Sequence, residues 1–208
     1  MQADWSVACG ADDPVVVVPW SEMTGHASGH ASGDASGSLR YVDLRKTPTA
    51  IDQITEASQY PSLAAALTRW NQPDAPLFTA KCDVWSFALE DFAPEDLPGF
   101  THAQASYVDL VSDKPAVYSS FTASERQLRV WTADAGRIEI MEGRCECTLR
   151  PARILTGIEE NTEASAWQSG FATTLYVWGY GVSPGAAAVA WGSALEALIE
   201  PVLRLIAS

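Results

Sequence analysis

The residue types that most often bind metal ions gather in one short stretch, GHASGHASGDASGS, at residues 25–38. A four-residue unit, xASG, occurs three times there and places His26, His30 and Asp34 at a spacing of four. In an α-helix this spacing aligns side chains along one face, which is how helices present two imidazoles to zinc. Two of the chain's three histidines lie in this stretch, so a metal site is the first hypothesis to weigh.

The glycines of the stretch argue against a helix. Glycine recurs at the same period of four, and each one costs about 0.8–1 kcal/mol relative to alanine in a helix interior. No apolar stripe offsets this cost. We therefore predict a flexible loop at about residues 22–39 and no metal site, with His26, His30 and Asp34 as the candidate ligands if a metal binds at all.

The four cysteines are a second candidate for metal or thiol chemistry. Cys145 and Cys147 alternate on a predicted strand, so both sulfur atoms lie on one face. Leu149 continues that face, which favours small core residues over metal ligands. Cys82 also lies among apolar residues, whereas Cys9 is flanked by small and polar ones and is expected to be exposed. Without an export signal, reduced thiols in the cytoplasm are expected.

Acid–base chemistry would need carboxylates and a lysine placed together. The strand predicted at residues 76–90 alternates and puts Lys81 and Asp83 on one face with Thr79 and Trp85. That face is either a solvated outer surface or the polar floor of a pocket. The candidate catalytic residues are Lys81, Asp83, Asp109 and His102.

Aromatic residues alternate along the strand predicted at residues 170–181. Tyr176, Trp178 and Tyr180 lie on one face, and the opposite face is also largely apolar. Such a strand is either covered on both sides or meets a partner. We expect Trp178 in a core, Tyr180 at a partner, and Arg150 stacked over one of the two. The candidate binding residues are Tyr176, Trp178, Tyr180, Arg150 and Trp85.

The pattern of elements predicts one α+β domain over residues 1–208. Strands are expected at 13–20, near 39–45, at 76–90, 145–155 and 170–181, a hairpin at 104–121 with its turn at 112–115, and helices at 49–59, 60–70, 122–136 and from about 184 to 206. This order reads ββα at 104–136 and again at 145–206. A mostly antiparallel sheet with helices packed on one face follows.

Composition and charge narrow the function. The formal net charge of −13 argues against nucleic-acid binding. No signal peptide and no apolar run of membrane-spanning length is visible, so we expect a cytoplasmic protein away from membranes. A glycine-rich phosphate loop, a nucleophile elbow and a zinc signature are not found in the sequence, and no cofactor is expected.

The leading hypothesis is therefore a small acidic protein that is a non-enzymatic binding or protein-interaction domain. Its partner would be a second copy of the chain or another protein, bound through the aromatic face of residues 170–181. The alternative is an enzyme that uses carboxylate and lysine acid–base chemistry in a pocket near Lys81 and Asp83.

Overall fold

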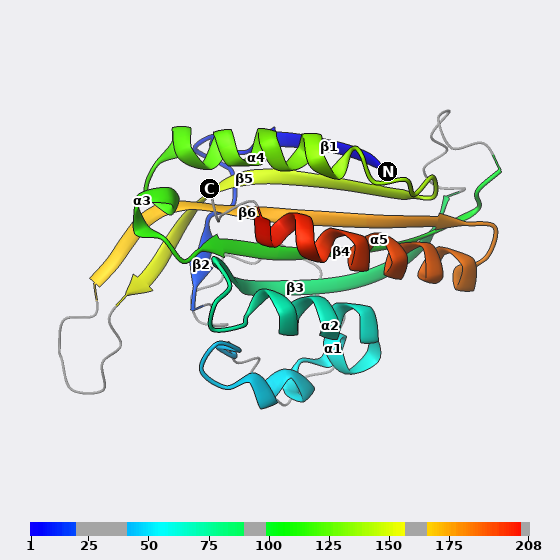
Figure 1. The fold of residues 1–208 in the computed structure, drawn as a ribbon, viewed down its shortest axis with the longest axis horizontal. Coiled ribbons are helices and arrows are strands. Elements are labelled where there is room, and N and C mark those ends of the chain that lie inside the picture. The colour runs from blue at the N-terminus through cyan, green and yellow to red at the C-terminus, as the bar shows by residue number, and fades with distance from the viewer. Residues whose placement is uncertain (20–40, 90–98, 157–165, 205–208) are drawn as a thin grey trace.

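The computed structural model describes residues 1–19, 41–89, 99–156 and 166–204. Helices accompany a six-stranded mixed sheet that is mostly antiparallel (Figure 1). The predicted α+β class and the mostly antiparallel sheet are thereby confirmed. The loop predicted at about residues 22–39 lies outside the described residues.

The strands and helices have the following bounds. The strands are β1 (Gln2–Val7), β2 (Val16–Val18), β3 (Leu77–Ala88), β4 (His102–Ser112), β5 (Gly143–Thr156) and β6 (Ala166–Gly181). The helices are α1 (Thr55–Gln59), α2 (Pro61–Trp70), α3 (Pro115–Tyr118), α4 (Phe121–Ala135) and α5 (Pro184–Arg204), and a 3-10 helix (Pro48–Gln53) precedes α1.

The order of strands across the sheet is β1-β5-β6-β4-β3, and β2 also pairs with β5, beyond the end of β1. The pairs β3–β4, β4–β6 and β5–β6 are antiparallel, whereas β1 and β2 run parallel to β5. The predicted antiparallel pairing of the two strands after residue 143 is confirmed, with Cys145 opposite Val177 and Cys147 opposite Leu175. These four side chains are fully buried in the main core.

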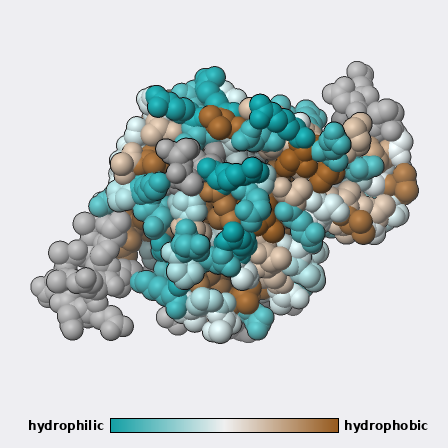
Figure 2. Space-filling view, in the orientation of Figure 1, coloured by the Kyte–Doolittle hydropathy of each residue, from teal (hydrophilic) through white to brown (hydrophobic). Residues whose placement is uncertain are grey.

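Two helices lie against the strands in Figure 1, α4 over β1 and β5, and α5 over β6 and β4. The Trp191 indole of α5 donates a hydrogen bond of 2.9 Å to Ser106 Oγ of β4, which identifies the sheet face that α5 covers. Leu195 and Leu198 of α5 are buried in the same core. The outer surface on this side is mainly hydrophilic, with small separate hydrophobic patches (Figure 2).

Helix α5 is also long and apolar enough, by composition, to cross a membrane, since its most apolar window has a mean hydropathy of 1.4. Half of that window is buried inside the protein. The buried residues, such as Leu195 and Leu198, contact the sheet and α2. The apolar residues of α5 therefore pack in the core of the protein.

The break predicted at Pro61 is confirmed, because α1 ends at Gln59 and α2 begins at Pro61. The hairpin predicted at 104–121 is wrong. β4 ends at Ser112, and Pro115 opens the short helix α3 instead of a turn, since its fixed φ and missing amide suit the first turn of a helix. β4 pairs with β3 and β6, so the ββα unit expected at 104–136 is also wrong in its bounds.

Three smaller expectations also fail. Thr122 and Glu125 have the spacing of a capping box, but the cap of α4 is Ser120, whose side chain accepts a hydrogen bond from the Ala123 amide. Residues 41–43 have no regular structure and residues 44–46 form a turn, so the strand expected near 39–45 is not found in the described part of this segment. A bulge between Thr79 and Cys82 breaks the alternation predicted for β3, so Thr79 lies on the α5 side and bonds to Asn71 of the α2 end.

Candidate functional site

Four aromatic side chains form a continuous cluster on the sheet face that points away from α5. Trp85 of β3 contacts Tyr107 of β4, with ring centroids 6.3 Å apart. Tyr107 contacts Tyr176 of β6 at 6.1 Å, and Tyr176 stacks on Trp178 at 5.7 Å. We call the surface formed by these four residues the aromatic face.

Strand register explains why these side chains meet. Tyr107 pairs with Tyr176, and Ala105 pairs with both Trp178 and Trp85. Residues directly opposite each other on neighbouring strands point to the same face. Ala105 therefore lies between the two tryptophans, whose strands are two apart, or about 9–10 Å. Because the Ala105 side chain is small, it leaves space for the rings on the neighbouring strands.

Charged side chains of both signs surround the aromatic face. Arg144 and Arg150 come from β5, where Glu146 lies between them and opposite Tyr176. The guanidinium carbon of Arg144 lies 5.5 Å from the Trp178 ring. Arg150 lies 5.9 Å from the Tyr176 ring and donates a hydrogen bond of 2.7 Å to its hydroxyl. Arg150 therefore does stack on an aromatic ring of β6, as expected, but the ring is that of Tyr176 and not that of Trp178 or Tyr180.

Both arginines retain unused hydrogen-bonding capacity. The Nε atoms of Arg144 and Arg150 are buried and have no hydrogen-bond partner among the described residues. A buried donor without a partner costs free energy comparable to that of a lost hydrogen bond. These two donors therefore remain unsatisfied beneath the surface of the aromatic face.

The exposures of Trp178 and Tyr180 are the reverse of those expected. Tyr180 is 8% exposed and packs with Leu89, Ala103 and Phe100, whose ring centroid lies 6.1 Å away. Trp178 is half-buried, as are Tyr176 and Trp85. The side chains that reach solvent are therefore Trp178 and Tyr176, which precede Tyr180 on β6.

The candidate catalytic residues are only partly brought together. Asp109 of β4 is buried and accepts a hydrogen bond of 2.6 Å from Thr174. Lys81 lies opposite Asp109 at the bulge, 6.0 Å from the Tyr107 ring, and Asp83 is exposed on the same face. His102 begins the same strand, seven residues or roughly 23 Å from Asp109.

Burial raises the pKa of the Asp109 carboxyl, although Thr174, Arg150 and Lys81 favour its charged form. The pocket around Arg45, described below, is not lined by Lys81, Asp83 or Asp109. Burial also raises the pKa of Tyr107 well above its usual range, with Asp109 and Asp83 adding to the shift. The centre of this face is therefore a carboxyl and a phenol that both resist ionisation.

The raised pKa of Asp109 gives a prediction about stability. A folded-state pKa above the unfolded one means that the folded protein binds the proton more tightly, so the charged carboxylate lowers stability at neutral pH. Asp109→Asn should raise the melting temperature at pH 7 by a few degrees, and the gain should shrink as the pH falls towards 4. Thermal melts of Asp109→Asn and of the parent protein between pH 4 and pH 7 measure this gain. A melting temperature of Asp109→Asn at pH 7 that is equal to or below that of the parent protein would contradict the prediction.

The cysteines occupy the positions expected for core residues. Cys145 and Cys147 are buried, Cys82 is half-buried, and Cys9 is exposed. Burial raises the pKa of Cys82 and of Cys145 to about 12 and that of Cys147 well above its usual value. A thiol is reactive as the thiolate, so these three sulfur atoms are protected.

Native thiol titration should therefore label Cys9 at most, and all four cysteines should react in denaturant. Mass spectrometry after alkylation identifies the modified residues. Rapid native labelling of Cys145 or Cys147 would contradict the packing described here.

Among the described residues no group of three His, Cys, Asp or Glu side chains could hold a metal ion. The candidate ligands His26, His30 and Asp34 lie outside those residues.

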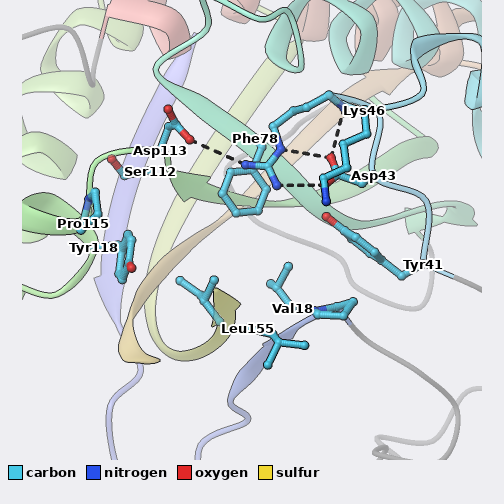
Figure 3. Close-up of a pocket in the computed structure, with 13 residues that line it drawn as sticks. Val18, Tyr41, Asp43, Lys46, Phe78, Ser112, Asp113, Pro115, Tyr118 and Leu155 are labelled. Carbon is cyan, nitrogen blue, oxygen red and sulfur yellow. Dashed lines mark hydrogen bonds and ion pairs between the residues drawn. The ribbon is translucent and has the colours of Figure 1, made fainter. Parts of the chain in front are cut away.

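A pocket of about 400 Å³ lies further along the sheet, where the start of β3 and the end of β4 meet β2 and α3, and was not anticipated from the sequence (Figure 3). Its central side chain is Arg45, which forms two bonds of 3.0 Å to the carboxylate of Asp43 and lies 3.7 Å over the Phe78 ring. The only sequence signal was the charged run Asp43, Arg45 and Lys46 in a segment assigned to a strand.

Comparison of the chain with models of protein families, with curated proteins and with solved structures finds no significant match.

Proposed function

We propose that this chain is a non-enzymatic protein-interaction domain whose aromatic face binds a second copy of the chain. The observation that carries the proposal is the cluster of Trp85, Tyr107, Tyr176 and Trp178, whose rings are in contact and half-buried on a sheet face away from α5. Tryptophan, tyrosine and arginine are the residues that most often dominate binding energy at interfaces.

The arginines strengthen this argument. Arg144 and Arg150 lie beside the rings with buried Nε donors that lack a partner. A carbonyl or carboxylate of a partner would accept charge-assisted hydrogen bonds from the exposed part of the Arg144 guanidinium, whose side chain is 36% exposed. A small apolar molecule offers no such acceptor, so a protein surface fits better.

The distribution of charge favours a second copy. On the β3 side of the rings the face carries Lys81 and Asp83, and on the β5 side it carries Arg144 and Glu146, which form an ion pair of 3.8 Å. In a two-fold interface the same patch meets itself, so a patch with both signs can pair each charge with its opposite.

The proposal includes a view of the architecture. We take β3–β4–α4 and β5–β6–α5 as two ββα units whose helices gather on one face of the sheet, which leaves the opposite face for binding. The ββα units describe the order along the chain, since α4 contacts β1 and β5 while α5 contacts β6 and β4. The common helical layer is supported by the single core cluster that α4 and α5 share. We also place the protein in the cytoplasm, where four free cysteines remain reduced.

Charge reversal tests the proposal. Asp83→Lys removes the complementarity of the face and should weaken self-association by roughly tenfold or more. Asp74→Lys makes the same change in net charge at an exposed position before β3 and should leave association unchanged. Sedimentation velocity over a range of concentrations measures both. Equal effects of the two variants would contradict the proposal.

An enzyme is the second candidate, and the burial of Asp109 is the observation that favours it. Burial raises the pKa of Asp109, although Lys81 favours its charged form, and a carboxyl with a raised pKa has the character of a general acid. Carbodiimide labelling of the native protein discriminates the two functions. Rapid labelling of Asp109 would favour a reachable catalytic acid, whereas protection of Asp109 would favour a structural role beneath the aromatic face.

A further inference from the structure

We propose that the pocket of Figure 3 binds a small amphipathic monocarboxylate, at a site separate from the aromatic face. Its volume of about 400 Å³ lies within the range typical of small-molecule sites. The pocket forms where β2, the segment at residues 41–46, the start of β3 and α3 meet. No residue of the aromatic face lines it.

One wall of the pocket is an arginine held in a fixed orientation. Arg45 uses Nε and Nη2 for the two oxygens of Asp43, and its plane lies 3.7 Å over the Phe78 ring. A guanidinium has a second edge that can bind another carboxylate in the same bidentate way. At that edge Nη1 lies 3.7 Å from Asp113, which is beyond hydrogen-bond distance. The side chain of Asp113 is 61% exposed, so it can turn away into solvent.

Two further donors point to an anion. Lys46 lines the pocket together with Arg45, and Figure 3 shows Lys46 near Asp43. Burial raises the pKa of Tyr41 to about 12, with Asp43 adding to the shift, so its hydroxyl keeps its proton at neutral pH. Asp43 is already paired with Arg45. A ligand carboxylate that replaces Asp113 would therefore meet two cations and one hydroxyl donor.

The opposite wall is apolar. In Figure 3 the side chains of Val18 and Leu155 lie across the pocket from Asp43 and Lys46. The apolar lining consists of Val18, Pro19, Phe78, Pro115, Ile154 and Leu155. A ligand that fits both walls has a carboxylate at one end and a hydrocarbon body at the other. An ammonium group in the same place would be repelled by Arg45 and Lys46.

Three probes with alkyl chains of the same length and different head groups test the proposal: octanoate, octylammonium and 1-octanol. Isothermal titration calorimetry should show saturable binding of octanoate at one site, and affinities for the other two at least roughly tenfold weaker. Methyl NMR shifts should locate octanoate beside Val18, Ile154 and Leu155. Equal affinity for all three probes, preference for octylammonium, or no saturable binding of octanoate would overturn the proposal.

Three variants test the assigned roles. Asp113→Asn removes the competing carboxylate and should strengthen octanoate binding by roughly threefold or more, whereas Lys46→Gln should weaken it by a similar factor. Trp178→Ala should leave octanoate binding unchanged, because Trp178 does not line the pocket. Weaker binding to Asp113→Asn would show that the anion does not replace Asp113. Both charged positions are exposed, so these variants are expected to fold.

Discussion

Replacing Gly179 by alanine is expected to lower the free energy of unfolding by about 3 kcal/mol or more, at the upper end of overpacking costs. Gly179 lies on β6 under α5, and a Cβ atom there would come within 1.9 Å of the Trp191 backbone nitrogen and 2.4 Å of its Cα. The neighbour is helix backbone, which cannot turn away as a side chain can. The helix must move off the sheet, and the core around Leu195 must open with it.

Gly185→Ala is the matched control for this change. Gly185 is in the first turn of α5, and a Cβ there would meet nothing within 4 Å. The same substitution should therefore leave stability unchanged or raise it slightly, since alanine is the better helix former. Thermal melts should show Gly179→Ala lowered by roughly 6–12 °C or more and Gly185→Ala not lowered. Equal melting temperatures would contradict the packing of α5 on β6.

Trp178→Ala is expected to weaken self-association by roughly thirtyfold or more, the effect of losing a hot-spot residue worth about 2 kcal/mol. The indole is half-buried in the monomer, where it stacks on Tyr176 and lies near Arg144. Its truncation should cost less stability than the 3–5 kcal/mol typical of a core tryptophan, at roughly 1 kcal/mol. Sedimentation gives the association constant, and a thermal melt gives the stability.

Trp167→Ala is the control for Trp178→Ala. Trp167 belongs to the same strand, is 43% exposed, and lies beside Arg153 at 5.2 Å, but it is far along β6 from the aromatic face. This variant should associate like the parent protein. If both variants lose association equally, a general loss of apolar surface explains the result and not the aromatic face. An unfolded Trp178→Ala would place Trp178 in the core.

Local patterns predicted the elements whose causes are local. Pro61 divides α1 from α2 because its ring excludes a continuous helix. The apolar alternation of Cys145, Cys147 and Leu149 placed β5 correctly in the core, because each strand residue points to a side set by its position.

Long-range features escaped the sequence analysis for physical reasons. β1 was missed because it is stabilised by parallel pairing with β5, about 140 residues away, and not by its own pattern. Thr79 was assigned to the wrong face because a bulge adds a residue that no periodicity reveals. Tyr180 is covered by Leu89 and Phe100, which come from the segment between β3 and β4.

The candidate sites also divide into features that a local pattern predicted and features that depend on distant segments. Tyr176, Trp178, Trp85 and Arg150 were named as candidate binding residues from their positions on predicted strands, and the structure places all four on one face. Tyr180, named with them, is buried. Tyr107 was missed, although it joins Trp85 to Tyr176. The pocket around Arg45 is built from several separate segments, so no local pattern could have predicted it.

The central claim is that the aromatic face is the interface between two copies of the chain. Oxidative footprinting with mass spectrometry tests it most directly, because tryptophan and tyrosine side chains report their own exposure to solvent. Between dilute and concentrated protein, Trp85, Tyr107, Tyr176 and Trp178 should become protected, and Trp167 should not. Protection confined to other residues, or no change with concentration, would contradict the account.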